Sequence, residues 1–264
     1  MQQAASAVNE PTKLFSLKGR LALVTGSSLG IGYALARGLG HAGARIVVNG
    51  RDSGRVAKAA ASLSAEGLTV AQAVFDVTKG EEVRAAIDRL EAEVGGTDIL
   101  INNAGIQRRM PLDEFPEETW HEIVATNLDS LFLVSQAVVR HMMPRCRGSI
   151  INICSVMSEL GRPGIAPYTA TKGAAKMLTK AMAIDWGRHG IRVNGIGPGY
   201  FKTELNAALV GDDAFSTLIT GRTPLARWGE LDELVGAAVF LASDAASFVT
   251  GHVLYVDGGV TAQL

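Results

Sequence analysis

Short apolar runs alternate with longer amphipathic segments along the whole chain, and this rhythm constrains the fold more than any other feature. Several runs, such as residues 21–25 (LALVT), are apolar almost throughout, as expected of strands buried on both faces of a parallel sheet. Strands are predicted at residues 21–25, 45–49, 70–76, 98–102, 149–154, 191–196 and 252–256. Helices are predicted at residues 30–41, 53–66, 81–94, 117–143, 168–188 and 230–241.

Strands that alternate with helices through right-handed crossovers form a doubly wound parallel sheet. We therefore predict an α/β protein with a single domain of the Rossmann type over residues 15–264. Residues 1–14 are expected to form a mobile arm, because terminal segments are often poorly ordered. Residues 199–229 interrupt the rhythm after a strand end, and we predict a small lid there that covers the substrate.

Charge and cysteine content exclude several classes of protein. The 25 basic and 26 acidic residues nearly balance, so the chain lacks the electrostatic signature of a nucleic-acid or anionic-membrane partner. Cys146 and Cys154 have no companion pair at zinc-site spacing, and no metal site is expected. The apolar run around Cys154 predicts a buried free thiol in a reducing cytoplasm. The N-terminus does not resemble a secretory signal, and no apolar stretch reaches the roughly 18 residues of a membrane span.

The first predicted strand leads into a glycine-rich turn, TGSSLGIG at residues 25–32. Gly26 allows a sharp turn, Gly30 lets a pyrophosphate approach the backbone, and Gly32 lets the helix pack close to the strand. The helix N-terminus then offers free N–H groups and a positive dipole end to a phosphate. Its position between a strand and a helix makes this turn a candidate dinucleotide site.

The end of the second strand bears on the choice of cofactor. Enzymes that use NAD usually place a carboxylate there, whereas this chain has Gly50 followed by Arg51. A guanidinium suits the 2′-phosphate of NADP, which we therefore prefer. NAD stays open, because Asp52 could reach the ribose if the turn were tighter.

Tyr168 and Lys172 are four residues apart, which places both side chains on one face of a helix. A free tyrosine has a pKa near ~10, too high for a base at neutral pH. A neighbouring ammonium stabilises the phenolate, so Tyr168 could remove a proton from an alcohol while a nicotinamide takes the hydride.

Two more polar residues complete the candidate catalytic group. Ser155 follows the fifth predicted strand, where its hydroxyl can hold a substrate oxygen. Asn127 lies inside the long predicted helix, although asparagine is a poor residue for a helix interior. We expect a structural bend or a water site at Asn127, from which a water could pass protons between Lys172 and solvent.

These segments together resemble the short-chain dehydrogenase/reductase family nearly end to end. The matching elements are TGSSLGIG at 25–32, Asp76, NNAG at 102–105, Asn127, Ser155, YTATK at 168–172 and PGYFKT at 198–203. The resemblance implies a catalytic tetrad of Asn127, Ser155, Tyr168 and Lys172. It implies a cofactor site formed by Gly26, Ser28, Leu29, Gly30, Ile31, Gly32, Arg51, Asp76, Val77, Asn103, Ala104, Gly105, Tyr168, Lys172, Pro198, Gly199 and Thr203. Many NADP-preferring members carry a basic residue where this chain has Leu29, which leaves Arg51 as the main phosphate contact.

The loops around the tetrad are similar to those of family members that interconvert D-gluconate and 5-dehydro-D-gluconate. A sugar acid needs a carboxylate receptor, and Arg109 follows the NNAG segment closely. Glu159 and Arg162 lie between Ser155 and Tyr168, where substrate loops usually pass. We expect Arg109 to bind the carboxylate and Glu159 to bind the polyol, with Ser155 and Tyr168 at the reacting carbon.

The sequence leaves other functions open. Relatives that oxidise 2-dehydro-3-deoxy-D-gluconate or 2-deoxy-D-gluconate also carry two arginines after NNAG, and reduction of 3-oxoacyl groups uses the same tetrad. A catalytically silent cofactor-binding regulator is a different class, although such a protein need not keep both Tyr168 and Lys172. The family resemblance also implies a homotetramer.

Overall fold

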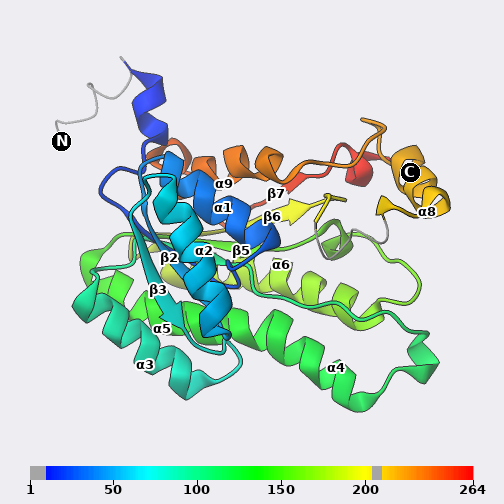
Figure 1. The fold of residues 1–264 in the computed structure, drawn as a ribbon, viewed down its shortest axis with the longest axis horizontal. Coiled ribbons are helices and arrows are strands. Elements are labelled where there is room, and N and C mark those ends of the chain that lie inside the picture. The colour runs from blue at the N-terminus through cyan, green and yellow to red at the C-terminus, as the bar shows by residue number, and fades with distance from the viewer. Residues whose placement is uncertain (1–9, 204–209, 264) are drawn as a thin grey trace.

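The computed structural model describes residues 10–203 and 210–263, which form one seven-stranded parallel sheet (Figure 1). The strand order is β3-β2-β1-β4-β5-β6-β7. The strands are β1 (Leu21–Val24), β2 (Arg45–Gly50), β3 (Val70–Val74), β4 (Ile99–Asn102), β5 (Gly148–Ile153), β6 (Ile191–Pro198) and β7 (Val253–Val256). The order reverses between β1 and β4, and a crevice for a ligand is expected at the carboxyl ends of these two strands.

Helices cover both faces of the sheet (Figure 1). They are α1 (Gly30–His41), α2 (Ser53–Ala65), α3 (Gly80–Glu93), α4 (Glu117–Val124), α5 (Ser130–Arg145), α6 (Ala166–Gly187), α8 (Asp213–Gly221) and α9 (Val235–Ala242). Buried side chains of α1, α2 and α9 belong to one core cluster, and those of α3, α5 and α6 belong to another.

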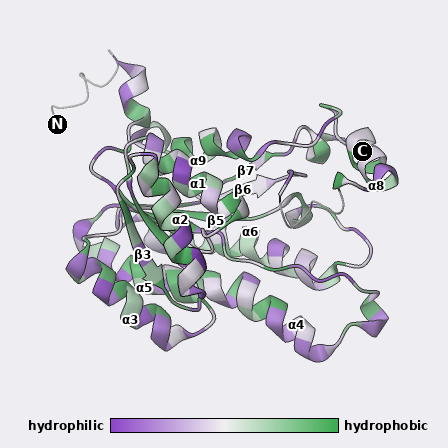
Figure 2. Cartoon of the chain, viewed as in Figure 1, coloured by the Kyte–Doolittle hydropathy of each residue, from purple (hydrophilic) through white to green (hydrophobic). Residues whose placement is uncertain are grey.

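Strand β1 shows why its sequence is continuously apolar. Leu21 and Leu23 belong to the core on one face of the sheet, whereas Ala22 and Val24 belong to the core on the other. Successive side chains of a strand point to opposite faces, so a strand covered on both sides is apolar at every position. Figure 2 shows the same distribution, with hydrophobic colour on the strands and polar colour on the outer faces of the helices.

The predicted sheet and helices are confirmed, with two differences along helices. The segment predicted as one helix at 117–143 contains a π-helical turn, Ala125–Asp129, between α4 and α5. The helix predicted from residue 230 begins as a 3-10 helix, Leu231–Leu234, before α9.

The segment Glu117–Arg145 is long and apolar enough to cross a membrane by length and composition alone, but half of its most apolar window is buried inside the structure. A buried core helix passes the same test.

The predicted N-terminal arm is only partly described, since residues 1–9 lie outside the described residues. Within its remainder, Pro11–Phe15 forms a short 3-10 helix, and the ring of Phe15 lies 6.4 Å from that of Phe240. Residues 11–13 are exposed and no residue of this short helix is buried, so the mobility of residues 1–14 stays a prediction.

The predicted lid, residues 199–229, contains the helix α8 and is joined at its base by a bridge between Phe201 and Gly229. Asp212 caps α8 by accepting hydrogen bonds from the backbone N–H groups of Ala214 and Phe215. Residues 204–209 of this predicted lid lie outside the described residues. Helix α8 projects beyond the carboxyl end of the sheet (Figure 1).

Candidate active site

The glycine-rich turn between β1 and α1 packs tightly against the segment that follows β4. Gly26 has a φ of +60°, and a Cβ atom on it would lie 2.9 Å from the Cα atom of Ala104. A Cβ atom on Gly32 would lie 2.4 Å from Nδ2 of Asn103 and 2.5 Å from the carbonyl oxygen of Gly26. Close approach of the helix to the strand therefore requires glycine at position 32.

Hydrogen bonds hold Asn103 and Ala104 in this position. Asn103 Nδ2 donates to the carbonyl oxygens of Thr25 and Gly26, at 2.9 and 3.0 Å. The hydroxyl of Thr25 accepts from the backbone N–H groups of Asn103 and Ala104, at 2.9 and 3.1 Å. The ends of β1 and β4, where the strand order reverses, are thus one rigid unit.

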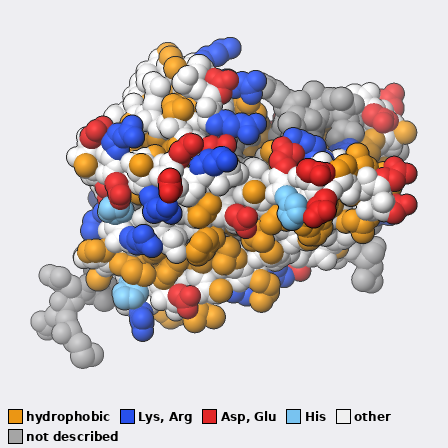
Figure 3. Space-filling model, turned by 90° about the horizontal axis from the view of Figure 1, so that it is seen from below, with side chains coloured by type: hydrophobic (Ala, Val, Ile, Leu, Met, Phe, Trp, Pro, Cys, Tyr) orange, Lys and Arg blue, Asp and Glu red, His pale blue; other side chains and the backbone are white. Residues whose placement is uncertain are grey.

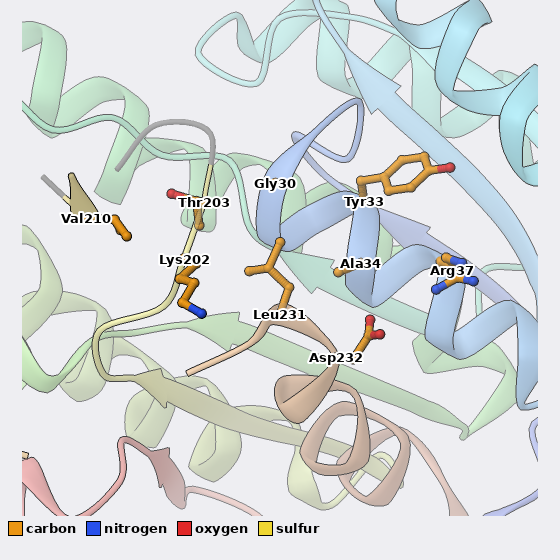
Figure 4. Close-up of a pocket in the computed structure, with 9 residues that line it drawn as sticks. All are labelled: Gly30, Tyr33, Ala34, Arg37, Lys202, Thr203, Val210, Leu231 and Asp232. Atoms are coloured by element: carbon orange, nitrogen blue, oxygen red, sulfur yellow. The ribbon is translucent and has the colours of Figure 1, made fainter. Parts of the chain in front are cut away.

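The N-terminus of α1 opens on free space. Leu29 is the N-cap residue, and its apolar side chain makes no capping hydrogen bond. Gly30 has a φ of +59°, and an added Cβ atom would meet nothing within 4 Å among the described residues. A cavity of about 660 Å³ begins at Gly30 and extends along the side of α1 towards Arg37 (Figure 4). Of the predicted cofactor residues, Gly30 and Thr203 line it. Uncapped N–H groups with adjoining space suit a phosphate.

Polar groups gather beyond the ends of β2 and β3. Although burial raises the pKa of Asp76, hydrogen bonds from Thr78 and the positive charge of Arg51 lower it more. Arg51 itself is exposed. The carboxylate of Asp52 instead caps α2, where it accepts from the backbone N–H of Arg55 at 2.9 Å.

Other predicted cofactor residues border the same edge of the sheet. Val77 is buried directly after Asp76, and Ile31 packs partly buried against the core beneath α1. Pro198 ends β6, and the backbone N–H of Gly199 donates to the carbonyl oxygen of Val256 at 3.0 Å. Ser28, Leu29 and Gly105 lie in the loops that follow β1 and β4.

Asn127 is fully buried inside the π-helical turn, an irregularity of the helix at the position where a bend or a water site was predicted. Its Oδ1 accepts from the backbone N–H of Ile106 at 2.8 Å, and its Nδ2 donates to the carbonyl oxygen of Ile106 at 2.9 Å. The amide therefore fixes the loop that continues from the NNAG segment. Such π-helical turns inside α-helices occur frequently at functional sites.

Ser155, Tyr168 and Lys172 converge at the carboxyl end of β5. Lys172 is buried on α6, and its Nζ donates to the carbonyl oxygen of Ile153 at 2.5 Å. The same ammonium lies 5.6 Å from the centre of the Tyr168 ring. Ser155 accepts from the backbone N–H of Met157 at 3.1 Å and lines one cavity with Tyr168.

That second cavity has a volume of about 100 Å³. Its lining residues come from the loops after β4, β5 and β6 and from the lid: Gln107, Arg109, Ser155, Val156, Met157, Arg162, Ile165, Tyr168, Gly199, Tyr200, Phe215 and Trp228. Of the predicted substrate residues, the structure brings Arg109, Ser155 and Tyr168 together here. Arg108 instead pairs with Glu122 at 2.9 Å, at an exposed position.

Glu159 is not among the residues that line this cavity. Its carboxylate accepts from the hydroxyl of Tyr255 at 2.6 Å and pairs with Lys176, and both contacts lower the pKa of Glu159. The expected role of Glu159 in binding a polyol is therefore not supported by its position. Phe215 and Trp228 were not predicted as site residues. Phe215 lies on the short helix α8 and Trp228 in the segment after it, and both line the cavity because of how the predicted lid packs.

The described residues, 10–203 and 210–263, contain no group of three or more His, Cys, Asp or Glu side chains that could hold a metal ion. Cys154 is buried and Cys146 is exposed, and neither forms a disulfide bond.

Comparison with known proteins places the chain among enzymes. A family model described as Enoyl-(Acyl carrier protein) reductase matches residues 26–261. A gluconate 5-dehydrogenase from Gluconobacter oxydans is 57% identical over 251 residues, which are 95% of this chain and 98% of that protein. A 5-keto-D-gluconate 5-reductase from Escherichia coli is 54% identical over 94% of this chain and 97% of its own length. The crystal structure of a gluconate 5-dehydrogenase from Burkholderia cenocepacia, in complex with NADP and tartrate, superposes with a TM-score of 0.93 at 58% identity and covers 95% of this chain and 98% of that one.

Proposed function

The chain belongs to the short-chain dehydrogenase/reductase family, and from this premise we propose that it is an NADP-dependent oxidoreductase that interconverts D-gluconate and 5-dehydro-D-gluconate. The observation that carries the proposal is one cavity lined by Ser155, Tyr168 and Arg109, in a chain 57% identical to a gluconate 5-dehydrogenase. This cavity combines groups suited to an alcohol carbon with a cation suited to a carboxylate.

The edge of the sheet around the glycine-rich turn fits a dinucleotide. The uncapped first turn of α1 would hold the pyrophosphate, Arg51 the 2′-phosphate, and Asp76 and Val77 the adenine end. Asn103, Ala104, Gly105, Pro198, Gly199 and Thr203 would border the nicotinamide half. When bound, the nicotinamide accepts or donates the hydride.

The tetrad would handle the proton. Tyr168 removes the hydroxyl proton of the alcohol in oxidation and returns it in reduction, while Ser155 holds the substrate oxygen. Lys172, buried 5.6 Å from the Tyr168 ring centre, stabilises the phenolate by its charge. Asn127, the fourth member of the tetrad, holds the loop after the NNAG segment through two hydrogen bonds to the backbone of Ile106.

Arg109 is our candidate for the carboxylate. Partial burial of the Arg109 side chain, followed by the charge of Arg162, lowers the pKa of Arg109, although the residue as a whole is exposed. An anion in the cavity would favour the charged guanidinium. Glu159 is not a candidate for binding the substrate, because Lys176 and Tyr255 hold its carboxylate.

Steady-state assays with a panel of substrates test this function. D-gluconate with NADP⁺ should give the highest kcat/KM in a panel that includes 2-dehydro-3-deoxy-D-gluconate, 2-deoxy-D-gluconate and a 3-oxoacyl thioester. The product should carry its carbonyl at C5 by ¹³C NMR. A higher kcat/KM with another member of the panel would contradict the substrate, and tight cofactor binding without turnover of any of them would favour the silent regulator.

We further propose a homotetramer in the cytoplasm. One face of the molecule carries a broad band of hydrophobic side chains (Figure 3). Exposed large apolar side chains include Trp120 on α4, Phe132 on α5, and Met177 and Ile184 on α6. Exposed apolar patches often mark contacts between proteins, which supports the assembly. The two cysteines form no disulfide bond, which supports a reducing compartment such as the cytoplasm. Light scattering should give about four times the 27.7 kDa mass of the chain, and a monomer would contradict the assembly.

A further inference from the structure

Two arginine side chains share one aromatic ring at the cavity of Ser155 and Tyr168. The guanidinium carbon of Arg109 lies 5.6 Å from the centre of the Phe215 ring, and that of Arg162 lies 5.2 Å from it. All three residues line the cavity. A cation within about 6 Å of an aromatic centre is attracted to the ring. Phe215 therefore attracts both guanidinium groups, although their like charges still repel each other.

Three separate segments bring these side chains together. The backbone N–H of Met110 donates to the carbonyl oxygen of Gly164 at 3.0 Å, which ties the loop carrying Arg109 to the loop carrying Arg162. Phe215 comes from α8 in the lid, where its ring centre lies 6.3 Å from that of Trp228. Trp228 Nε1 in turn donates to Ser216 Oγ at 2.7 Å and anchors the first turn of α8.

The charges of this group are not balanced within the cavity. Its described lining contains two arginines and no acidic side chain. Nη1 of Arg162 is buried and has no hydrogen-bond partner in the described part of the chain. Burying an unpaired polar or charged group costs free energy, which a carboxylate would offset by accepting charge-assisted hydrogen bonds.

We infer that Arg162 is a specificity-determining residue, which together with Arg109 forms a receptor for the carboxylate of the substrate. Phe215 is a positioning residue that holds both guanidinium groups. This inference rests on the proposed function and extends it: the receptor selects sugar acids over uncharged polyols of the same length. Tyr168 lines the same cavity, so one ligand can contact both the receptor and the tetrad.

The test is Arg162→Leu, with Arg108→Leu as a matched control. Arg108 lies beside Arg109 in sequence but pairs with the exposed Glu122 outside the cavity. Loss of a charge-assisted hydrogen bond predicts a kcat/KM for D-gluconate about 10- to 100-fold lower in Arg162→Leu, mainly through KM. We expect a low kcat/KM for D-sorbitol, which has no carboxylate, and this value should be the same in the wild type and in Arg162→Leu. Arg108→Leu should leave both rates unchanged.

Two further variants separate the charge from the fold. Arg162→Lys keeps the positive charge but lacks the planar guanidinium, so its KM for D-gluconate should lie between those of the wild type and Arg162→Leu. If Arg162→Leu does not fold, Arg162→Lys provides the test instead. Phe215→Leu keeps the apolar volume without the ring, and loss of the cation–π contact should lower kcat/KM for D-gluconate about three- to tenfold. Equal losses with D-gluconate and D-sorbitol would show a merely structural role and overturn the inference.

Calorimetric titration of D-gluconate into the NADP⁺-loaded protein gives a readout that does not depend on turnover. It should show weaker binding to Arg162→Leu than to Arg108→Leu. If the wild type oxidises D-gluconate but Arg162→Leu matches Arg108→Leu, the receptor is wrong and the proposed function stands. If the wild type does not oxidise D-gluconate, the proposed function fails. The receptor is then tested by binding alone, and equal affinities for D-gluconate and D-sorbitol would overturn it.

Discussion

Replacing Gly32 by alanine should disrupt the junction between α1 and β4. The added Cβ atom would lie 2.4 Å from Nδ2 of Asn103 and 2.5 Å from the carbonyl oxygen of Gly26. Neither neighbour can move freely, because the Asn103 amide donates two hydrogen bonds, at 2.9 and 3.0 Å, and Gly26 is backbone held by Asn49. Overpacking of this kind costs about 1–3 kcal/mol, which at this chain length lowers Tm by about 2–12 °C.

The matched control is Gly236→Ala in α9. An alanine Cβ there meets nothing within 4 Å among the described residues, so the same substitution should stabilise the protein by about 0.5–1 kcal/mol. Thermal unfolding at one protein concentration compares the two variants, and fluorescence titration of NADPH measures the cofactor site. Gly32→Ala should lower both Tm and affinity. A Gly32→Ala protein with the Tm and NADPH affinity of the wild type would refute the close packing described here.

Three other perturbations probe the site and the surface. Asn127→Ala leaves both backbone groups of Ile106 without their partner and should destabilise the protein by about 1–3 kcal/mol in urea unfolding; an unchanged midpoint would contradict the role of Asn127 as an anchor. Arg51→Leu should raise KM for NADP⁺ about tenfold or more and leave KM for NAD⁺ unchanged, and equal effects on the two would remove Arg51 from the 2′-phosphate site. Arg227 lowers the pKa of Glu233 to about 2, so the stabilising contact is present above the ordinary pKa near 4.5 and is lost as pH falls towards 2. In Arg227→Leu, an NMR titration of Glu233 should show a higher pKa, and no change would refute the pairing.

Most of the fold could be predicted because burial on both faces leaves a direct trace in the sequence. All four residues of β1 are apolar since each faces one core or the other. The close approach at Gly32 and an irregularity of the helix at Asn127 could also be predicted, because each depends on a local conformational property of one residue type. The contact of Phe15 with Phe240 could not be predicted, because it joins positions far apart in the chain.

The substrate side of the site was less predictable for the same reason. Glu159 lies between Ser155 and Tyr168 in sequence, yet Tyr255, 96 residues away, takes up its carboxylate. Phe215 comes to the arginines on α8, and the direction that this helix faces depends on how the predicted lid packs against the loops that carry Arg109 and Arg162. Local spacing marks a catalytic group, whereas the pocket around it depends on long-range packing.

In the proposed reaction, Tyr168 exchanges the proton while the hydride moves between the cofactor and a sugar acid. The most direct measurement is the initial rate of NADPH formation from D-gluconate by the wild type and by Tyr168→Phe, with NADPH affinity measured in parallel. Loss of the phenol should lower kcat by about 10²- to 10⁴-fold and leave the cofactor affinity nearly unchanged. A Tyr168→Phe protein that oxidises D-gluconate at the rate of the wild type would contradict this role of Tyr168.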